Sequence, residues 1–134
     1  MKIIDIEGIG PVWAKKLTDA GVRTTDALLK NGGTRKARQM LANKTGLATT
    51  QILEWVNRAD LYRIKGVGSE YSDLLERAGV DTVVELANRN AANLSKAIKE
   101  LVGAGTRIVR RIPSDREIAS WVAQAKSLPR AVEY

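Results

Sequence analysis

Apolar residues recur at helical spacing along most of the chain, and polar capping residues mark where helices begin. One face of a predicted helix over 11–20 carries Val12, Trp13, Leu17 and Ala20. Further helices are predicted from a Thr24 cap to about residue 30, from a Thr34 cap to about residue 44, and from residue 49 or 50 through Trp55.

The second half of the chain has the same character. Helices are predicted from a Ser69 cap to Gly79, from Thr82 onward, from an Asn93 cap to about residue 102, and from Ser114 to just before Pro129. Residues 1–6 form either a single turn or an extended segment, and no stretch alternates as a strand would. The expected fold class is all-α.

The pattern occurs twice. Residues 6–24 return as residues 64–82, and residues 52–59 return as residues 118–125. Identical residues include Gly8 and Gly66, Gly10 and Gly68, Leu17 and Leu75, Gly21 and Gly79, Val22 and Val80, Trp55 and Trp121. The chain therefore divides into two tandem repeats of roughly sixty residues, 1–61 and 62–134, packed as one compact unit or as two closely docked halves.

Each repeat contains a glycine loop directly before a predicted helix. The first glycine loop is Gly8, Ile9 and Gly10, and the second is Gly66, Val67 and Gly68. Glycine permits backbone conformations that other residues avoid, while the apolar residue between the two glycines can enter the core. The amides that follow are the free donors of a helix N-terminus, where geometry and the helix dipole both favour an anion.

This spacing resembles the helix-hairpin-helix motif of DNA repair and recombination proteins, in which the anion is a phosphate of the nucleic-acid backbone. Over its whole length the chain is similar to an uncharacterised bacterial family of tandem helix-hairpin-helix proteins, and also to the small N-terminal helical domains of recombinases. The resemblance implies two helix-hairpin-helix units, each followed by two further helices, and backbone contacts that read no bases. It implies no catalytic mechanism.

Charge is distributed unevenly over these repeats. The 134 residues carry 22 Lys and Arg against 15 Asp and Glu, a net charge of +7. Residues 27–53 and 86–114 each carry +5, and the acidic stretch 54–85 lies between them. Near the first glycine loop stand Lys15 and Lys16, whereas Glu70 and Asp73 occupy the matching region of the second. We therefore expect the second loop to be mainly structural.

The candidate nucleic-acid contacts come from the loops and the two basic segments. They are Gly8, Ile9, Gly10, Val12, Lys15, Lys16, Arg35, Lys36, Arg38, Gly66, Gly68, Arg107, Arg110 and Arg111. The run that contains Arg35, Lys36 and Arg38 fits a solvated helix face as well as a binding surface. Trp13, Trp55 and Trp121 occupy apolar positions, where the core is expected and stacking on bases is the alternative.

The chain has no His and no Cys. This excludes a Cys/His zinc site, a Cys nucleophile and a Ser-His-Asp triad, so no enzyme, metal or cofactor is expected. No membrane span or export signal is expected, and the cytoplasm is the default location. We expect a non-enzymatic module that binds the DNA backbone without sequence specificity. The alternative is a protein-interaction or scaffolding module that has lost nucleic-acid binding; the choice between DNA and RNA, and the oligomeric state, stay open.

Overall fold

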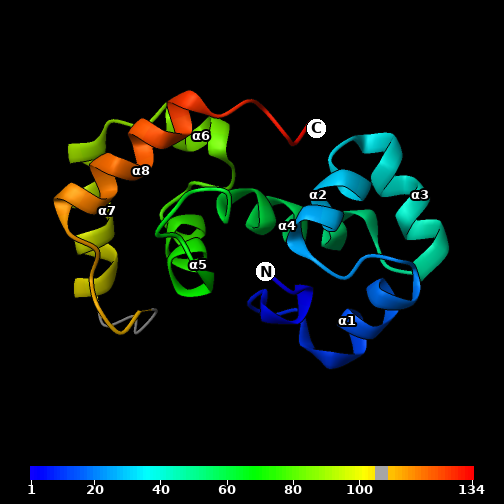
Figure 1. Ribbon diagram of the computed structural model, residues 1–134. Helices are drawn as coiled ribbons and strands as arrows, with labels where there is room; N and C mark the ends of the chain where they lie inside the picture. The colour runs from blue at the N-terminus through cyan, green and yellow to red at the C-terminus, as the bar shows by residue number, and fades with distance from the viewer. Residues whose placement is uncertain (105–108) are drawn as a thin grey trace. The chain divides into compact units, whose positions relative to one another are not determined.

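The computed structural model describes residues 1–104 and 109–134, and this part of the chain is helical throughout (Figure 1). A 3-10 turn, η1 (Ile3–Asp5), precedes eight α-helices: α1 (Gly10–Asp19), α2 (Thr25–Gly32), α3 (Arg35–Thr45), α4 (Thr49–Leu61), α5 (Ser69–Arg77), α6 (Val83–Ala87), α7 (Ala91–Gly103) and α8 (Asp115–Ser127). Extended pairing in the described residues is limited to an isolated antiparallel bridge between Lys2 and Thr24. The predicted all-α class is confirmed.

The chain folds into two compact units. Unit 1 comprises Met1–Asp60 together with Arg130–Tyr134, and unit 2 comprises Leu61–Pro129. The last five residues therefore lie with unit 1, although the sequence repeat placed them with the second segment. Within unit 1, α2 packs on α3 and α1 packs on η1; within unit 2, α8 packs on α6 and α7 (Figure 1).

The apolar positions around both glycine loops are buried. In unit 1 they are Ile3, Ile6, Ile9, Ala14 and Leu17; in unit 2 they are Leu61, Ile64, Val67 and Leu75. Trp55 and Trp121 are each only 2% exposed, which confirms their predicted core positions. The residue between the two glycines of each loop thus anchors that loop in the core of its own unit.

The predicted core position of Trp13 is wrong. Trp13 is 41% exposed and Val12 is 64% exposed, because α1 turns Ala14 and Leu17 inward instead. The apolar face of α1 was therefore placed about one residue from its true position along the helix. Successive residues of a helix are separated by about 100°, so a shift of one position moves a side chain from the core to its edge.

Most predicted helix ends are confirmed, and two caps are corrected. Thr24, Thr34, Thr82 and Ser114 cap their helices as predicted. The N-cap of α5 is Gly68 rather than Ser69, because Gly68 already has the extended conformation that an N-cap needs. The N-cap of α7 is Asn90 rather than Asn93: the side chain of Asn90 accepts from the Asn93 amide.

Candidate nucleic-acid interface

The first glycine loop turns the chain from η1 into α1 through two left-handed residues. Gly8 has φ +83° and Gly10 has φ +66°, a region that other residues rarely adopt. The Ile9 amide donates to the Ile6 carbonyl at 3.2 Å, and the Ile9 side chain is fully buried. In the described residues, nothing lies within 4 Å of the place where a β-carbon would stand on either glycine, so the loop is open on its outer side.

The N-terminus of α1 begins at this loop and has an unusual first turn. No described side chain caps it, and its first turn carries no acidic residue. Pro11 has no amide hydrogen, so the donors of the turn are the amides of Gly10, Val12 and Trp13. Five of the other helices are capped by a side chain of Thr, Asn or Ser. Among the described residues, neither a side-chain cap nor a first-turn acid of α1 therefore offsets the positive end of its dipole.

Two lysines and Trp13 follow on the exposed side of α1. Lys15 Nζ lies 2.9 Å from Asp19 Oδ2, and the Lys15 side chain is 75% exposed. An exposed i,i+4 ion pair of this kind contributes little, so Lys15 is available to another anion. Lys16 Nζ lies 5.0 Å from the centroid of the Trp13 ring. The sequence analysis did not predict this contact between an ammonium and an aromatic ring. The signal that could have indicated it is the lysine three residues after Trp13 on the same helix.

In the second glycine loop α8 covers Gly66, whereas no described atom lies within 4 Å of the place where a β-carbon would stand on Gly68. Gly66 has φ +96°, and a β-carbon there would stand 3.1 Å from Trp121 Nε1. Gln124 accepts from the Lys65 amide at 2.9 Å and donates to the Lys65 carbonyl at 3.2 Å. Gly68 differs from Gly10, because its φ of −101° lies outside the left-handed region. These contacts tie Lys65 and Gly66 to α8.

The first turn of α5 also carries its own acid. Glu70 Oε1 accepts from Arg110 Nε at 3.1 Å. A carboxylate at this place satisfies the helix dipole and repels a phosphate. Arg111 is similarly engaged, because both of its Nη atoms donate to the Glu117 carboxylate, at 2.7 and 2.9 Å. Arg107 lies outside the described residues.

The basic run on α3 divides into two kinds of residue. Arg35 and Lys36 are exposed in the first turn, directly after the Thr34 cap. Arg38 is only 4% exposed, which corrects its predicted place on an open basic face. Its Nη1 donates to the Gly32 and Gly33 carbonyls at 2.9 and 3.1 Å, and Nη2 donates to the Glu133 carbonyl at 2.6 Å. Burial lowers the pKa of this guanidinium. Its hydrogen bond to Glu133 joins α3 to the C-terminal residues of unit 1.

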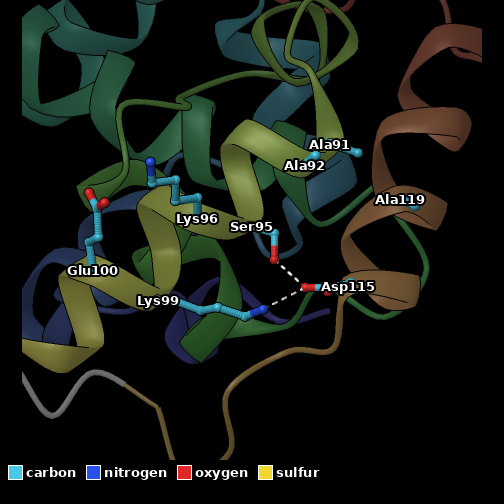
Figure 2. Close-up of a pocket in the computed structure, with 8 residues that line it drawn as sticks. All are labelled: Ala91, Ala92, Ser95, Lys96, Lys99, Glu100, Asp115 and Ala119. Atoms are coloured by element: carbon cyan, nitrogen blue, oxygen red, sulfur yellow. Dashed lines mark hydrogen bonds and ion pairs between the residues drawn. The ribbon is translucent and has the colours of Figure 1, made fainter.

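A cavity of about 680 Å³ lies between α7 and α8 in unit 2, and Figure 2 shows its lining. Ser95 Oγ and Lys99 Nζ both donate to Asp115 Oδ1, which lowers the pKa of that carboxyl below its ordinary value. Asp115 is the first residue of α8, so these contacts join the start of α8 to α7.

Fold and site together define an all-helical protein with an open, uncapped helix N-terminus beside exposed cations. The sequence profile of the family described as Domain of unknown function (DUF4332) matches residues 7–128, and the chain belongs to this family. No curated protein and no solved structure matches the chain. No helix in the described part of the chain is long and apolar enough to cross a membrane.

Proposed function

We propose that this chain is a non-enzymatic, tandem helix-hairpin-helix module that binds the DNA backbone without sequence specificity. The first glycine loop holds a phosphate at the amides of the first turn of α1. Lys15 and Lys16 flank that phosphate, and the exposed Arg35 and Lys36 at the start of α3 are further candidate backbone contacts. The observation that carries the proposal is the α1 N-terminus, which lacks a side-chain cap and a first-turn acid and opens onto the exposed first loop.

The placement of Arg35 and Lys36 supports the same function. Cations in the first turn of a helix face the positive end of its dipole, which costs stability. A phosphate bound there reverses the sign of this interaction. We assign no phosphate to the second loop, because Glu70 in the first turn of α5 offsets the helix dipole and repels an anion there.

The exposed apolar side chains of Val12 and Trp13 favour a second candidate, a module that binds another protein through the same helix turn. The two candidates differ in their response to salt. Backbone binding weakens steeply as salt rises, since each phosphate contact releases counterions. An apolar protein contact does not weaken in this way.

The test is a titration of duplex DNA at two salt concentrations with paired variants. Gly10→Val and Gly21→Val place the same strained residue at opposite ends of α1, since Gly21 also has positive φ and an open outer side among the described residues. We expect both variants to be less stable than the original chain, and only Gly10→Val to lose affinity for DNA. Lys15→Ala/Lys16→Ala is paired with Arg116→Ala/Lys126→Ala, two exposed cations of α8.

The double lysine variant should reduce the slope of log affinity against log salt by about 2, and the α8 pair should leave it unchanged. Absence of binding by the unsubstituted chain at low salt, to single-stranded DNA as well as to the duplex, would overturn the proposal. Equal losses in the two paired cation variants would show a general charge effect and would remove the first loop from the interface.

A further inference from the structure

Trp13 lies at the surface of unit 1, unlike the other two tryptophans of the chain. Trp55 and Trp121 are 2% exposed, whereas Trp13 leaves 41% of its surface in solvent. The matching residue of the second repeat, Tyr71, is absorbed by its own unit: its ring lies 5.2 Å from that of Trp121, and its hydroxyl donates to the Arg111 carbonyl. At equivalent positions of the two repeats, Tyr71 therefore packs within its unit, whereas Trp13 remains exposed.

The Trp13 ring lies close to the donors of the first turn. Side chains of a helix lean toward its N-terminus, so the indole lies over the turn that begins at Gly10. The Trp13 amide is itself one of those donors. Lys16, three residues on, leans back in the same way and holds its ammonium 5.0 Å from the ring centroid. Helix amides, an aromatic face and a cation thus follow one another along one side of α1.

This chemistry fits a nucleotide better than an apolar protein surface. A protein partner that covered the ring would also remove water from the Lys16 ammonium, and burying an ammonium without an anion is costly. A nucleotide supplies a flat ring and a phosphate together. In a duplex the base faces are covered by neighbouring base pairs, so only an unstacked base can lie on the indole.

We propose that Trp13 stacks on a base adjacent to the phosphate held by the first glycine loop, so that this site prefers single-stranded DNA. The inference rests on the proposed function, since the phosphate contact places the base. Trp13 is then the residue that determines the preferred form of nucleic acid, while the amides and lysines supply affinity for any backbone.

The test compares an oligothymidylate, an abasic strand of equal length and a duplex, each titrated against the full chain at one salt concentration. We expect the oligothymidylate to bind about 5- to 100-fold more tightly than the abasic strand, which has the same phosphates and no bases. It should also bind more tightly than the duplex and quench the exposed indole, while Trp55 and Trp121 stay shielded.

Trp13→Leu should bring oligothymidylate binding close to the abasic value, and Trp13→Phe should restore part of the difference. Because Trp13 lies outside the core, unchanged circular dichroism is expected for both variants. Equal binding of the two strands by the unsubstituted chain, or a difference that survives in Trp13→Leu, would overturn this inference and leave backbone binding standing.

Two further outcomes are distinct. Failure to bind any of the three ligands would remove the proposed function and this inference with it. A change in the sedimentation of the free chain on Trp13→Leu, with no change in the ratio between strands, would overturn base stacking in favour of a protein contact.

Discussion

Trp121 lies against Gly66, so close that a β-carbon on Gly66 would stand 3.1 Å from the indole Nε1. Gln124, on the same helix, binds the amide and the carbonyl of the preceding Lys65. In unit 1, no described atom comes within 4 Å of the corresponding position on Gly8. One sequence pattern thus gives a first glycine that is covered in unit 2 and open in unit 1, and the residues that cover Gly66 belong to α8.

Alanine substitutions at Gly8 and Gly66 should differ in their effect on stability, because only Gly66 is covered by Trp121. Both Gly8→Ala and Gly66→Ala force a side chain into positive φ, a loss of about 1–2 kcal/mol. Gly66→Ala also requires the buried Trp121 indole to shift by a few tenths of an ångström, so we expect a further loss of about 1 kcal/mol. The measurement is urea unfolding followed by Trp121 or Trp55 fluorescence in backgrounds where the other tryptophans are Phe. Equal losses would show that Trp121 moves without cost.

Arg38 should be required for stability rather than for binding. Arg38→Ala removes three donors from carbonyls, two of them bound in buried hydrogen bonds, and should lower the free energy of unfolding by about 2–4 kcal/mol. Arg38→Lys should recover little, because an ammonium lacks the planar fork. Hydrogen exchange of the Glu133 amide, which donates to the Gly33 carbonyl at 2.8 Å, should speed up. The control is Arg35→Ala, exposed on the same helix, with a change within about 0.5 kcal/mol.

Lys36 should show stability and binding changing in opposite directions. Lys36→Glu places an acid in the first turn of α3, and the helix dipole should raise stability by about 0.3–1 kcal/mol while affinity for DNA falls. Lys44→Glu makes the same charge change in the last turn of the same helix and should lower stability. Thermal unfolding and DNA titration of both variants check this. A Lys36→Glu variant that binds DNA as well as the original chain would remove α3 from the interface.

The helices and the buried loop residues were predictable because their signals are local. Caps such as Thr34 and the spacing from Ile6 through Ile9 to Leu17 depend on a few neighbouring residues. The exposure of Trp13 was not predictable from periodicity, since Ala14 and Leu17 define an inner face only one residue away. Ala14 is a small residue and contributes little to the apolar pattern, whereas the neighbouring Trp13 contributes strongly to it.

The state of the cations was also beyond sequence reasoning. Arg35 and Arg38 belong to one basic run, yet only Arg38 is buried, because carbonyls of Gly32 and Glu133 surround its guanidinium. Glu133 is 95 residues away along the chain. Net charge by segment counts Arg38 together with the exposed cations, whereas its tertiary contacts remove it from solvent.

The start of α8 combines a capping box with an ion pair. Ser114 accepts from the Glu117 amide through its hydroxyl, and Glu117 accepts from the Ser114 amide at 3.0 Å. Hydrogen bonds from Arg111, with this amide, lower the pKa of the Glu117 carboxyl to about 2. The charged form of Glu117 is therefore the form that the folded unit 2 favours.

Acid should weaken unit 2 through this carboxyl. Because the pKa of Glu117 is lower in the folded chain than its ordinary value of 4.5, the stabilisation is complete above pH 4.5 and is lost as pH falls toward 2. Glu117→Gln should flatten the dependence of unfolding free energy on pH in this window, and Arg111→Gln should do so by returning the Glu117 pKa toward its ordinary value. Trp121 fluorescence during urea unfolding at several pH values measures the slope. A slope unchanged in both variants would contradict the ion pair as its source, since each removes one partner of the same contact.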